Sequence, residues 1–348
     1  MSKSQHICLS LFLCLTAVTF AQVDPALAGP ALGGGRIKLD VVVTDKQGKP
    51  VSGLALKDFT LLDNGQPGEI LSFHDPDGAV QPSDPPIEMI LVIDTINLPI
   101  EGVIYIRHEV ERFLRRNDGH LALPISVFVL TKQGVGFQHQ ASLDGNELAA
   151  EMNEHANKLS PVLPSQGVNG EIELFKVSVD TLISIVNSER RKPGRKLLVW
   201  AGHGWPILDS LSIESSPKTR QQYFDVIVEL STRLREARIP VYSISPGHPG
   251  NDTFLHEAFI KGVKSPEKAS IPNLALRVLA IQSGGRVMGP DNDVAGQIDI
   301  CIQDASAFYS IAFDPPRATL PNEYHDLKVQ IDQPGLTART NTGYYNQP

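Results

Sequence analysis

Uninterrupted apolar runs in the middle of the chain constrain its fold more than any other feature. They are EMILVIDT (residues 88–95), PISVFVLT (124–131), RKLLVWAGHG (195–204) and IPVYSISPG (239–247). A strand that is buried on both faces has no polar side, so it appears as a continuous apolar run and not as an alternating one. These segments are expected to be the inner strands of a sheet, with GGRVMG (284–289) as a further short strand.

Segments with the periodicity of amphipathic helices lie between these runs. They span residues 103–116, 171–187, 219–237 and 272–283. Strands that alternate with helices predict a mostly parallel sheet that carries helices on both faces. The expected fold class of residues 87–306 is therefore α/β, with a doubly wound, mostly parallel sheet.

The segments on either side of this region contain short alternating strands and tight turns. Residues 36–76 alternate polar and apolar side chains and turn at Asp45–Gly48 and Asp63–Gly65. Residues 307–346 have the same character, and the Pro/Asp-rich segment 75–86 is a predicted linker. Each piece alone has too few strands to close a core. The two pieces are therefore expected to form one small, discontinuous β-sandwich domain.

The first residues have the pattern of a secretory signal peptide. Lys3 supplies a short positive segment, and an apolar stretch follows from residue 7 to residue 20. This stretch is too short to cross a bilayer comfortably, but it fits the apolar region of a signal peptide. We therefore expect the protein to be secreted or periplasmic, in the space of the cell envelope.

Two cleavage points fit this pattern. The signal peptide is expected to cover residues 1–21, and an alternative end lies at residue 28, where Ala26-Leu27-Ala28 has small residues in the required places. A flexible leader, rich in Pro, Gly and Ala, is expected over residues 22–35. No later apolar run reaches about 18 residues, so no transmembrane segment is expected after signal removal.

Charge and cysteine content exclude further classes. The net charge of −8 and the pI near 5.7 argue against a nucleic-acid-binding surface. Cys8 and Cys14 would leave with the signal peptide, which leaves Cys301 alone and excludes an internal disulfide. Cys301 lies among apolar residues, so it is interpreted as a buried structural thiol and not as a nucleophile.

At EMILVIDTINLP (88–99) the middle of the chain resembles a von Willebrand factor type A domain. The flanking patterns are VVVTDKQGKPVSGLALKDFTLLDNGQPGEILSF and FYSIAFDPP…YHDLKVQI…LTARTNTGYYN. With them, residues 36–346 look like the VWFA-related family of secreted proteins common in Acidobacteria. The resemblance implies a sheet that binds ligands at the carboxyl ends of its strands. It also implies a metal-ion-dependent adhesion site for magnesium, built from an Asp-x-Ser-x-Ser motif with a later Thr and a second Asp.

The adhesion-site motif is degenerate in this chain. Asp94 matches, but Ile96 and Leu98 occupy the two Ser positions and offer no oxygen. The loop 166–171 has no Thr, and His203 stands about where the second Asp belongs. Magnesium requires near-ideal octahedral oxygen ligands. We therefore expect no bound magnesium and no other cofactor.

Other side chains at these strand ends are candidates for a ligand face. Thr95 and Asn97 are polar but lie one place out of the motif's register. Trp205 follows two glycines and is expected to be exposed on the loop face, where an aromatic ring can anchor a partner. Trp200 is interpreted as a core residue of its strand. His203 is open to two interpretations, a transition-metal ligand together with Asp94 or a plain loop histidine.

Two functions from different classes follow for this face. The first is a non-catalytic, adhesion- or scaffold-like module that binds a protein partner through its strand-end loops. The alternative is an extracytoplasmic hydrolase that uses Asp94 and His203. In this alternative Asp94 is a catalytic carboxylate, whereas in the binding module it caps the loop amides. Ser245 lacks the Gly-x-Ser-x-Gly spacing of a hydrolase nucleophile. A cluster of Asp94, His203 and a hydroxyl in a deep pocket favours the enzyme, and a shallow loop face favours the binding module.

Overall fold

The computed structural model describes residues 35–75, 87–156, 168–205, 216–246, 255–289 and 291–348. Within it, Leu32–Pro348 form one compact unit. The predicted signal peptide (1–21), nearly all of the leader (22–35) and most of the linker (75–86) lie outside the described residues. No helix in the described part is both long and apolar enough to cross a membrane.

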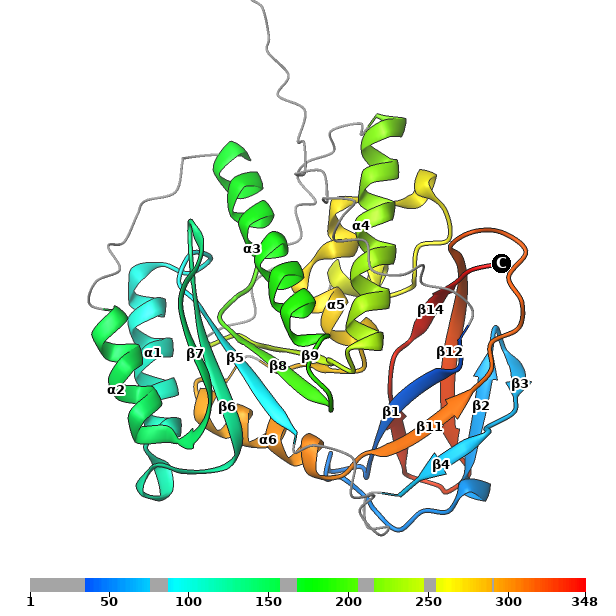
Figure 1. Cartoon of the computed structure of the whole chain (residues 1–348), viewed down its shortest axis with the longest axis horizontal. Helices are drawn as coiled ribbons and strands as arrows, with labels where there is room; N and C mark the ends of the chain where they lie inside the picture. The colour runs from blue at the N-terminus through cyan, green and yellow to red at the C-terminus, as the bar shows by residue number, and fades with distance from the viewer. Residues whose placement is uncertain (1–34, 76–86, 157–167, 206–215, 247–254, 290) are drawn as a thin grey trace, which may run out of the picture. The chain divides into compact units, whose positions relative to one another are not determined.

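A six-stranded sheet in the order β10-β9-β8-β5-β6-β7 occupies the middle of the chain (Figure 1). Every neighbouring pair is parallel except β6 and β7, which form an antiparallel hairpin at one edge. The prediction of a mostly parallel α/β sheet is therefore confirmed. Its strands are β5 (Glu88–Asp94), β6 (His120–Thr131), β7 (Gly134–Asp144), β8 (Lys196–Ala201), β9 (Val241–Ile244) and β10 (Arg286–Val287).

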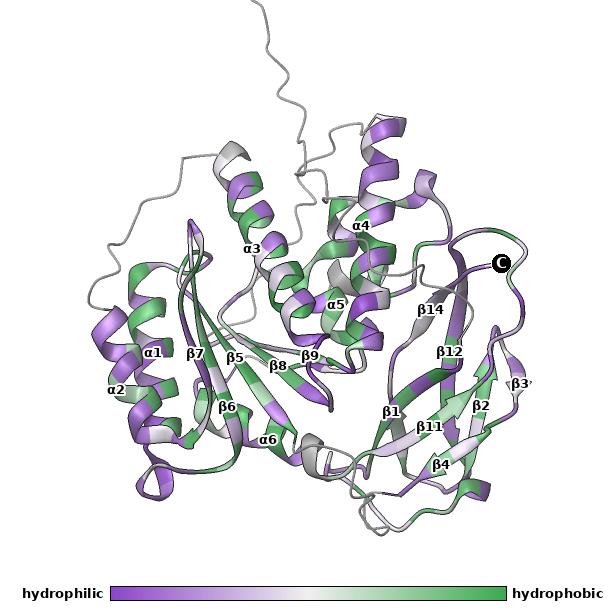
Figure 2. Ribbon diagram, viewed as in Figure 1, coloured by the Kyte–Doolittle hydropathy of each residue, from purple (hydrophilic) through white to green (hydrophobic). Residues whose placement is uncertain are grey.

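Helices cover both faces of this sheet. One face packs on α1, α2 and α6, which share a buried apolar cluster with alternate residues of β5, β6 and β8. Helices α3, α4 and α5 lie on the opposite side (Figure 1). Figure 2 shows the inner strands as mostly apolar and the outer sides of α2 and α4 as polar. The helices are α1 (Ile100–Leu114), α2 (Gly145–Ala156), α3 (Val168–Glu189), α4 (Pro217–Glu236), α5 (Leu276–Gln282) and α6 (Val294–Ser306).

Some elements were not expected from the sequence, namely β7, α2 and α6. The predicted helix over residues 272–283 is shorter than expected, because a 3-10 turn at Ile271–Leu274 precedes α5. The other 3-10 turns lie at Leu56–Asp58, Arg116–Gly119, Leu255–Phe259 and Pro266–Lys268.

Two four-stranded antiparallel sheets combine strands from both ends of the folded chain. Their orders are β13-β1-β11-β4 and β14-β12-β2-β3. The sheets share one buried apolar cluster. Their strands are β1 (Ile37–Thr44), β2 (Phe59–Asp63), β3 (Gln66–Gly68), β4 (Ser72–His74), β11 (Tyr309–Phe313), β12 (Glu323–Ile331), β13 (Thr337–Arg339) and β14 (Gly343–Asn346).

Buried polar contacts also join the two ends. The hydroxyl of Tyr309 accepts a hydrogen bond from the amide of Leu54 (3.0 Å) and donates one to the carbonyl of Val51 (3.1 Å). The Tyr344 hydroxyl donates to the carboxylate of Asp63 at 2.6 Å. Burial, together with this carboxylate, raises the pKa of Tyr344. The strands of the two ends therefore share both a core and specific hydrogen bonds.

Cys301 lies on α6 and is fully buried. Burial raises the pKa of its thiol well above the usual range, and the Asp304 charge adds to this effect. We expect a chain that starts at Gln22 to be inert to a thiol-reactive dye while folded, because the thiolate is the reactive form. In denaturant the same chain should take up one equivalent, measured by absorbance. Labelling of the folded chain at the rate of a free thiol would contradict this interpretation.

Candidate functional site

The candidate site lies where β5, β8 and β9 end. β5 ends at Asp94, β8 is followed by the loop 202–205, and Ser245 follows β9 directly. These strands are neighbours and run parallel, so their carboxyl ends meet at one edge of the sheet. Helix α1 begins at the same edge (Figure 1). This geometry brings together the residues that the sequence placed on the ligand face.

The Asp94 carboxylate is fully buried and accepts four hydrogen bonds from its own chain. Its Oδ1 atom accepts from the backbone amides of Ile96 (3.1 Å) and Asn97 (3.0 Å). Its Oδ2 atom accepts from Asn97 Nδ2 (2.8 Å) and from the indole Nε1 of Trp200 (2.9 Å). A carboxylate has about four lone-pair sites. All of these sites are therefore engaged by N–H donors.

The other polar residues of this loop are also turned toward the chain. The Thr95 hydroxyl donates to the carbonyl of Leu130 at 2.5 Å. Asn97 Nδ2 also donates to Ser178 Oγ on α3 at 3.1 Å, and Ser178 donates in turn to the carbonyl of Leu174. The structure therefore gives Thr95 and Asn97 positioning contacts that hold the loop against β6 and α3.

The loop after β8 passes so close to Asp94 that it needs glycine. Gly202 has a φ of 149°, and a Cβ atom there would lie 2.5 Å from Asp94 Cβ. Gly204 has a φ of 62°, and a Cβ atom at that position would collide with the side chain of Leu276. His203 is consequently held between two positions at which the backbone leaves no room for a side chain.

The His203 ring contacts a hydroxyl at this edge. Its Nδ1 atom lies 2.5 Å from the Oγ atom of Ser245, which is buried. The residue as a whole is exposed, but its ring is partly enclosed, and this desolvation lowers the pKa of His203. The charge of Asp94 opposes the shift and that of Arg277 adds to it. His203 is therefore expected to be neutral at pH 7.

The prediction that Trp205 is exposed is wrong. Its side chain is only 2% exposed, and its indole Nε1 donates to the carbonyl of Leu274 at 2.7 Å. Its ring also meets that of Trp200 edge-on, with centroids 5.1 Å apart. The left-handed conformation of Gly204 brings the next residue inward, so Trp205 packs under the segment that precedes α5. It cannot anchor a partner from that position.

The residues at this site do not fit a magnesium ion. The side chains of Ile96 and Leu98 carry no oxygen, and that of Leu98 packs against the apolar core. The Asp94 oxygens face N–H donors, which repel a cation. His203 offers an imidazole where a hard ion prefers a carboxylate. These side chains therefore do not provide the oxygen ligands that a magnesium ion requires.

We predict that magnesium leaves the thermal stability of the chain unchanged. A ligand stabilises a protein only by binding its folded state, and this site presents no free carboxylate oxygen. Melting curves of chain that has been stripped of metal with EDTA, recorded with and without millimolar magnesium, should coincide. A rise in Tm with magnesium that vanishes in Asp94→Asn would restore a working adhesion site.

Sequence reasoning located Asp94 and His203 but missed the hydrogen bond from Trp200. That residue was expected to act in the core, and it does lie there, fully buried, yet its indole also supports the carboxylate. A polar N–H on an otherwise apolar strand beside a buried Asp is the signal that points to such a contact. The contact between Ser178 on α3 and Asn97 carries no comparable signal in the sequence.

Comparisons with known proteins give no family for this chain. No family model and no curated protein matches it. One similar solved structure is the human COPII-coat protein Sec24c, with a TM-score of 0.32 and 8% identity over 76% of this chain. The chain spans 44% of the length of that protein. Another is a point mutant of the PilB minor pilin from Streptococcus sanguinis, with a TM-score of 0.34 and 10% identity over 77% of this chain and 79% of the pilin. At these TM-scores neither likeness identifies a function.

Proposed function

We propose that this chain is a non-catalytic, adhesion- or scaffold-like module that binds a protein partner at the strand-end edge of its parallel sheet. The observation that carries the proposal is a pair of exposed apolar side chains at the start of α1. Ile100 is 49% exposed and Ile104 is 60% exposed. They follow the Asp94 loop directly and lie four residues apart, so they share one face of the helix.

The chemistry of this edge favours apolar docking over ion-bridged capture. The loop's carboxylate, amide and hydroxyl groups at Asp94, Asn97 and Thr95 are directed into the chain. The two isoleucines are directed outward. Neighbouring exposed apolar side chains, rimmed by polar residues, are typical of protein-interaction surfaces. Recognition would rest on shape and apolar contact, with no magnesium bridge.

Position-specific photo-crosslinking tests the proposal. A photoreactive residue at position 104 should give a discrete protein adduct in the native envelope fraction. The same residue at position 320, where Leu320 is 66% exposed, serves as the matched control and should give none. The adduct at position 104 should disappear in an Ile100→Ser background and should persist in EDTA. Equal adducts from both positions, or none from position 104, would contradict the proposal.

The proposed location is the secreted or periplasmic space, and it rests on the leader sequence. Lys3 and the apolar stretch 7–20 predict export. Mass spectrometry of the protein from its native source should find a mature N-terminus at Gln22 or Gly29. A cytosolic form that retains residues 1–21 would overturn this location.

A hydrolase remains the second candidate because of one contact, His203 Nδ1 to Ser245 Oγ at 2.5 Å. A base within hydrogen-bond reach of a hydroxyl is the first requirement for a serine nucleophile. A third group should then orient the base, but the Asp94 oxygens are engaged by the donors described above. A fluorophosphonate probe that labels the chain, but not Ser245→Ala, would favour the hydrolase.

A further inference from the structure

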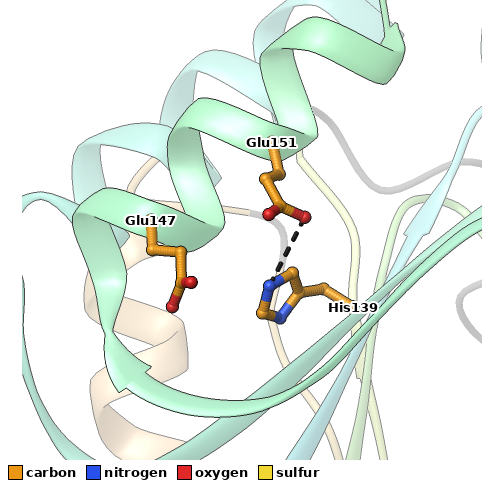
Figure 3. A group of neighbouring side chains, drawn as sticks. All are labelled: His139, Glu147 and Glu151. Carbon is orange, nitrogen blue, oxygen red and sulfur yellow. Dashed lines mark ion pairs between the residues drawn. The ribbon is translucent and has the colours of Figure 1, made fainter.

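A second group of side chains that can bind a metal lies away from the strand-end site, on the edge strand β7 and on helix α2. His139 projects from the edge strand β7, while Glu147 and Glu151 project from successive turns of α2 toward it (Figure 3). One ligand atom from each residue can be chosen so that all three atoms lie within 4.8 Å of one another. Strand β7 and helix α2 thus bring one imidazole and two carboxylates together.

The spacing of the closest pair fits a shared ion. His139 Nε2 and Glu151 Oε2 are 3.4 Å apart. Zinc binds nitrogen and oxygen ligands at about 2.0–2.2 Å in tetrahedral geometry, which places two ligand atoms roughly 3.3–3.5 Å apart. One ligand atom of Glu147 already lies within 4.8 Å of those of the other two residues, so a small movement of this exposed side chain brings its carboxylate to the same ion.

The tautomer of His139 also indicates a place for a cation between His139 and Glu151. Its Nδ1 atom lies 2.6 Å from the carbonyl oxygen of Gln140. A carbonyl only accepts, so Nδ1 carries a proton, and Nε2 of the neutral ring presents a lone pair to the Glu151 carboxylate. Two acceptors that face each other need a cation between them, either a proton on the ring or a metal ion. A backbone carbonyl on the far nitrogen is the usual support of a metal-binding histidine.

The scaffold holds the group in place. Asp144 caps α2 by accepting from the amides of Asn146 (2.9 Å) and Glu147 (3.1 Å). Leu148 and Met152 are fully buried, so the opposite face of α2 is fixed to the sheet. Within the described residues, no Lys or Arg forms an ion pair with Glu147 or Glu151. Their negative charges are therefore available to a cation.

We propose that His139, Glu147 and Glu151 form a binding site for a divalent transition-metal ion of the zinc type. Imidazole ligands favour zinc, copper, nickel or cobalt over magnesium and calcium, which prefer oxygen ligands alone. Three protein ligands leave one tetrahedral position open to water or to a group from a partner. Ser142 Oγ donates to Glu147 Oε2 at 3.0 Å and orients that ligand.

Calorimetric titration with zinc chloride tests the site in the purified chain, with any histidine tag removed. One equivalent should bind, and the Tm should rise with zinc but not with magnesium. Loss of a hydrogen bond that supports a metal ligand weakens metal binding roughly 10–100-fold. His139→Gln removes a ligand itself, so it should weaken zinc binding by more than that. Ser142→Ala removes such a support and should weaken binding by roughly 10-fold. Cobalt should give the strong visible absorption of a tetrahedral ion.

Matched histidine variants separate this site from adventitious binding. His203→Gln tests the strand-end site, and His74→Gln tests an unrelated position on β4. Both should bind zinc as the parent chain does. Zinc binding that is absent, or that survives His139→Gln and Glu151→Gln unchanged, would overturn the proposal and leave an ordinary ion pair between His139 and Glu151. Circular dichroism of each variant would verify that the fold is retained.

Discussion

Deletion of residues 307–348 is expected to unfold the first strands of the chain as well as remove the last ones. β1 pairs with β11 from Ile37↔Phe313 to Val41↔Tyr309, and β2 pairs with β12 from Phe59↔Ile331 to Asp63↔Leu327. Without the tail, β1 loses both of its neighbours in the sheet and β2 keeps only the short β3. A two-stranded remnant is marginally stable at best.

Limited proteolysis followed by mass spectrometry measures this effect. In the truncated chain, residues 36–74 should be cleaved at early times, while in the full chain they should resist. A chain that ends at Asn346 keeps all of the strands and is the matched control. Ile311→Asp, which places a charge in the shared core, should expose the same segment without any deletion. Equal protease resistance of the head in the truncated and full chains would refute a shared β region.

Asp94→Ala is expected to destabilise the chain by at least about 1–3 kcal/mol, the cost of one buried donor left without a partner. The substitution removes the acceptor of four hydrogen bonds, and at least the indole N–H of Trp200 is then fully buried without a partner. An unsatisfied buried donor costs about 1–3 kcal/mol. Since a typical domain has only about 5–15 kcal/mol of stability, this loss is large.

Urea unfolding, followed by tryptophan fluorescence, measures the free energy of unfolding directly. Asp94→Asn keeps one acceptor oxygen and should show a smaller loss than Asp94→Ala. Asp332→Ala removes an exposed carboxylate and should stay within about 0.5 kcal/mol of the parent chain. A loss below about 1 kcal/mol for Asp94→Ala would mean that water replaces the carboxylate, and that the site is more open than its burial indicates.

The sequence predicted the inner part of the fold well because burial dictates it. The four long apolar runs correspond to β5, β6, β8 and β9, whose residues are enclosed from both sides. β7 was missed because an edge strand is half exposed, and Phe137 is its only buried residue. Helix α2 was missed because little of its short sequence is strongly apolar. Elements at the margin of a sheet carry a weaker sequence pattern than those inside it.

The candidate site was predicted in outline only. Strand ends placed Asp94 and His203 at one edge, and the missing hydroxyls argued against magnesium. The hydrogen bond from Trp200 depends on the register of β5 against β8, in which Val92 faces Trp200, and a single sequence does not reveal that register. Trp205 was misplaced because glycine neighbours suggested an open loop, whereas their backbone angles direct the ring inward.

The pairing of the two chain ends also determines the order in which the protein can fold during synthesis. Arg36 and Asp314, an ion pair next to the first rung of β1 on β11, are 278 residues apart. The ribosome therefore releases β1 long before its partner strand exists, and the apolar side chains of Leu39 and Val41 stay uncovered in the nascent chain. Such late, non-local pairing slows folding and prolongs exposure to aggregation. We therefore expect the nascent chain to be prone to aggregation until its last strands emerge.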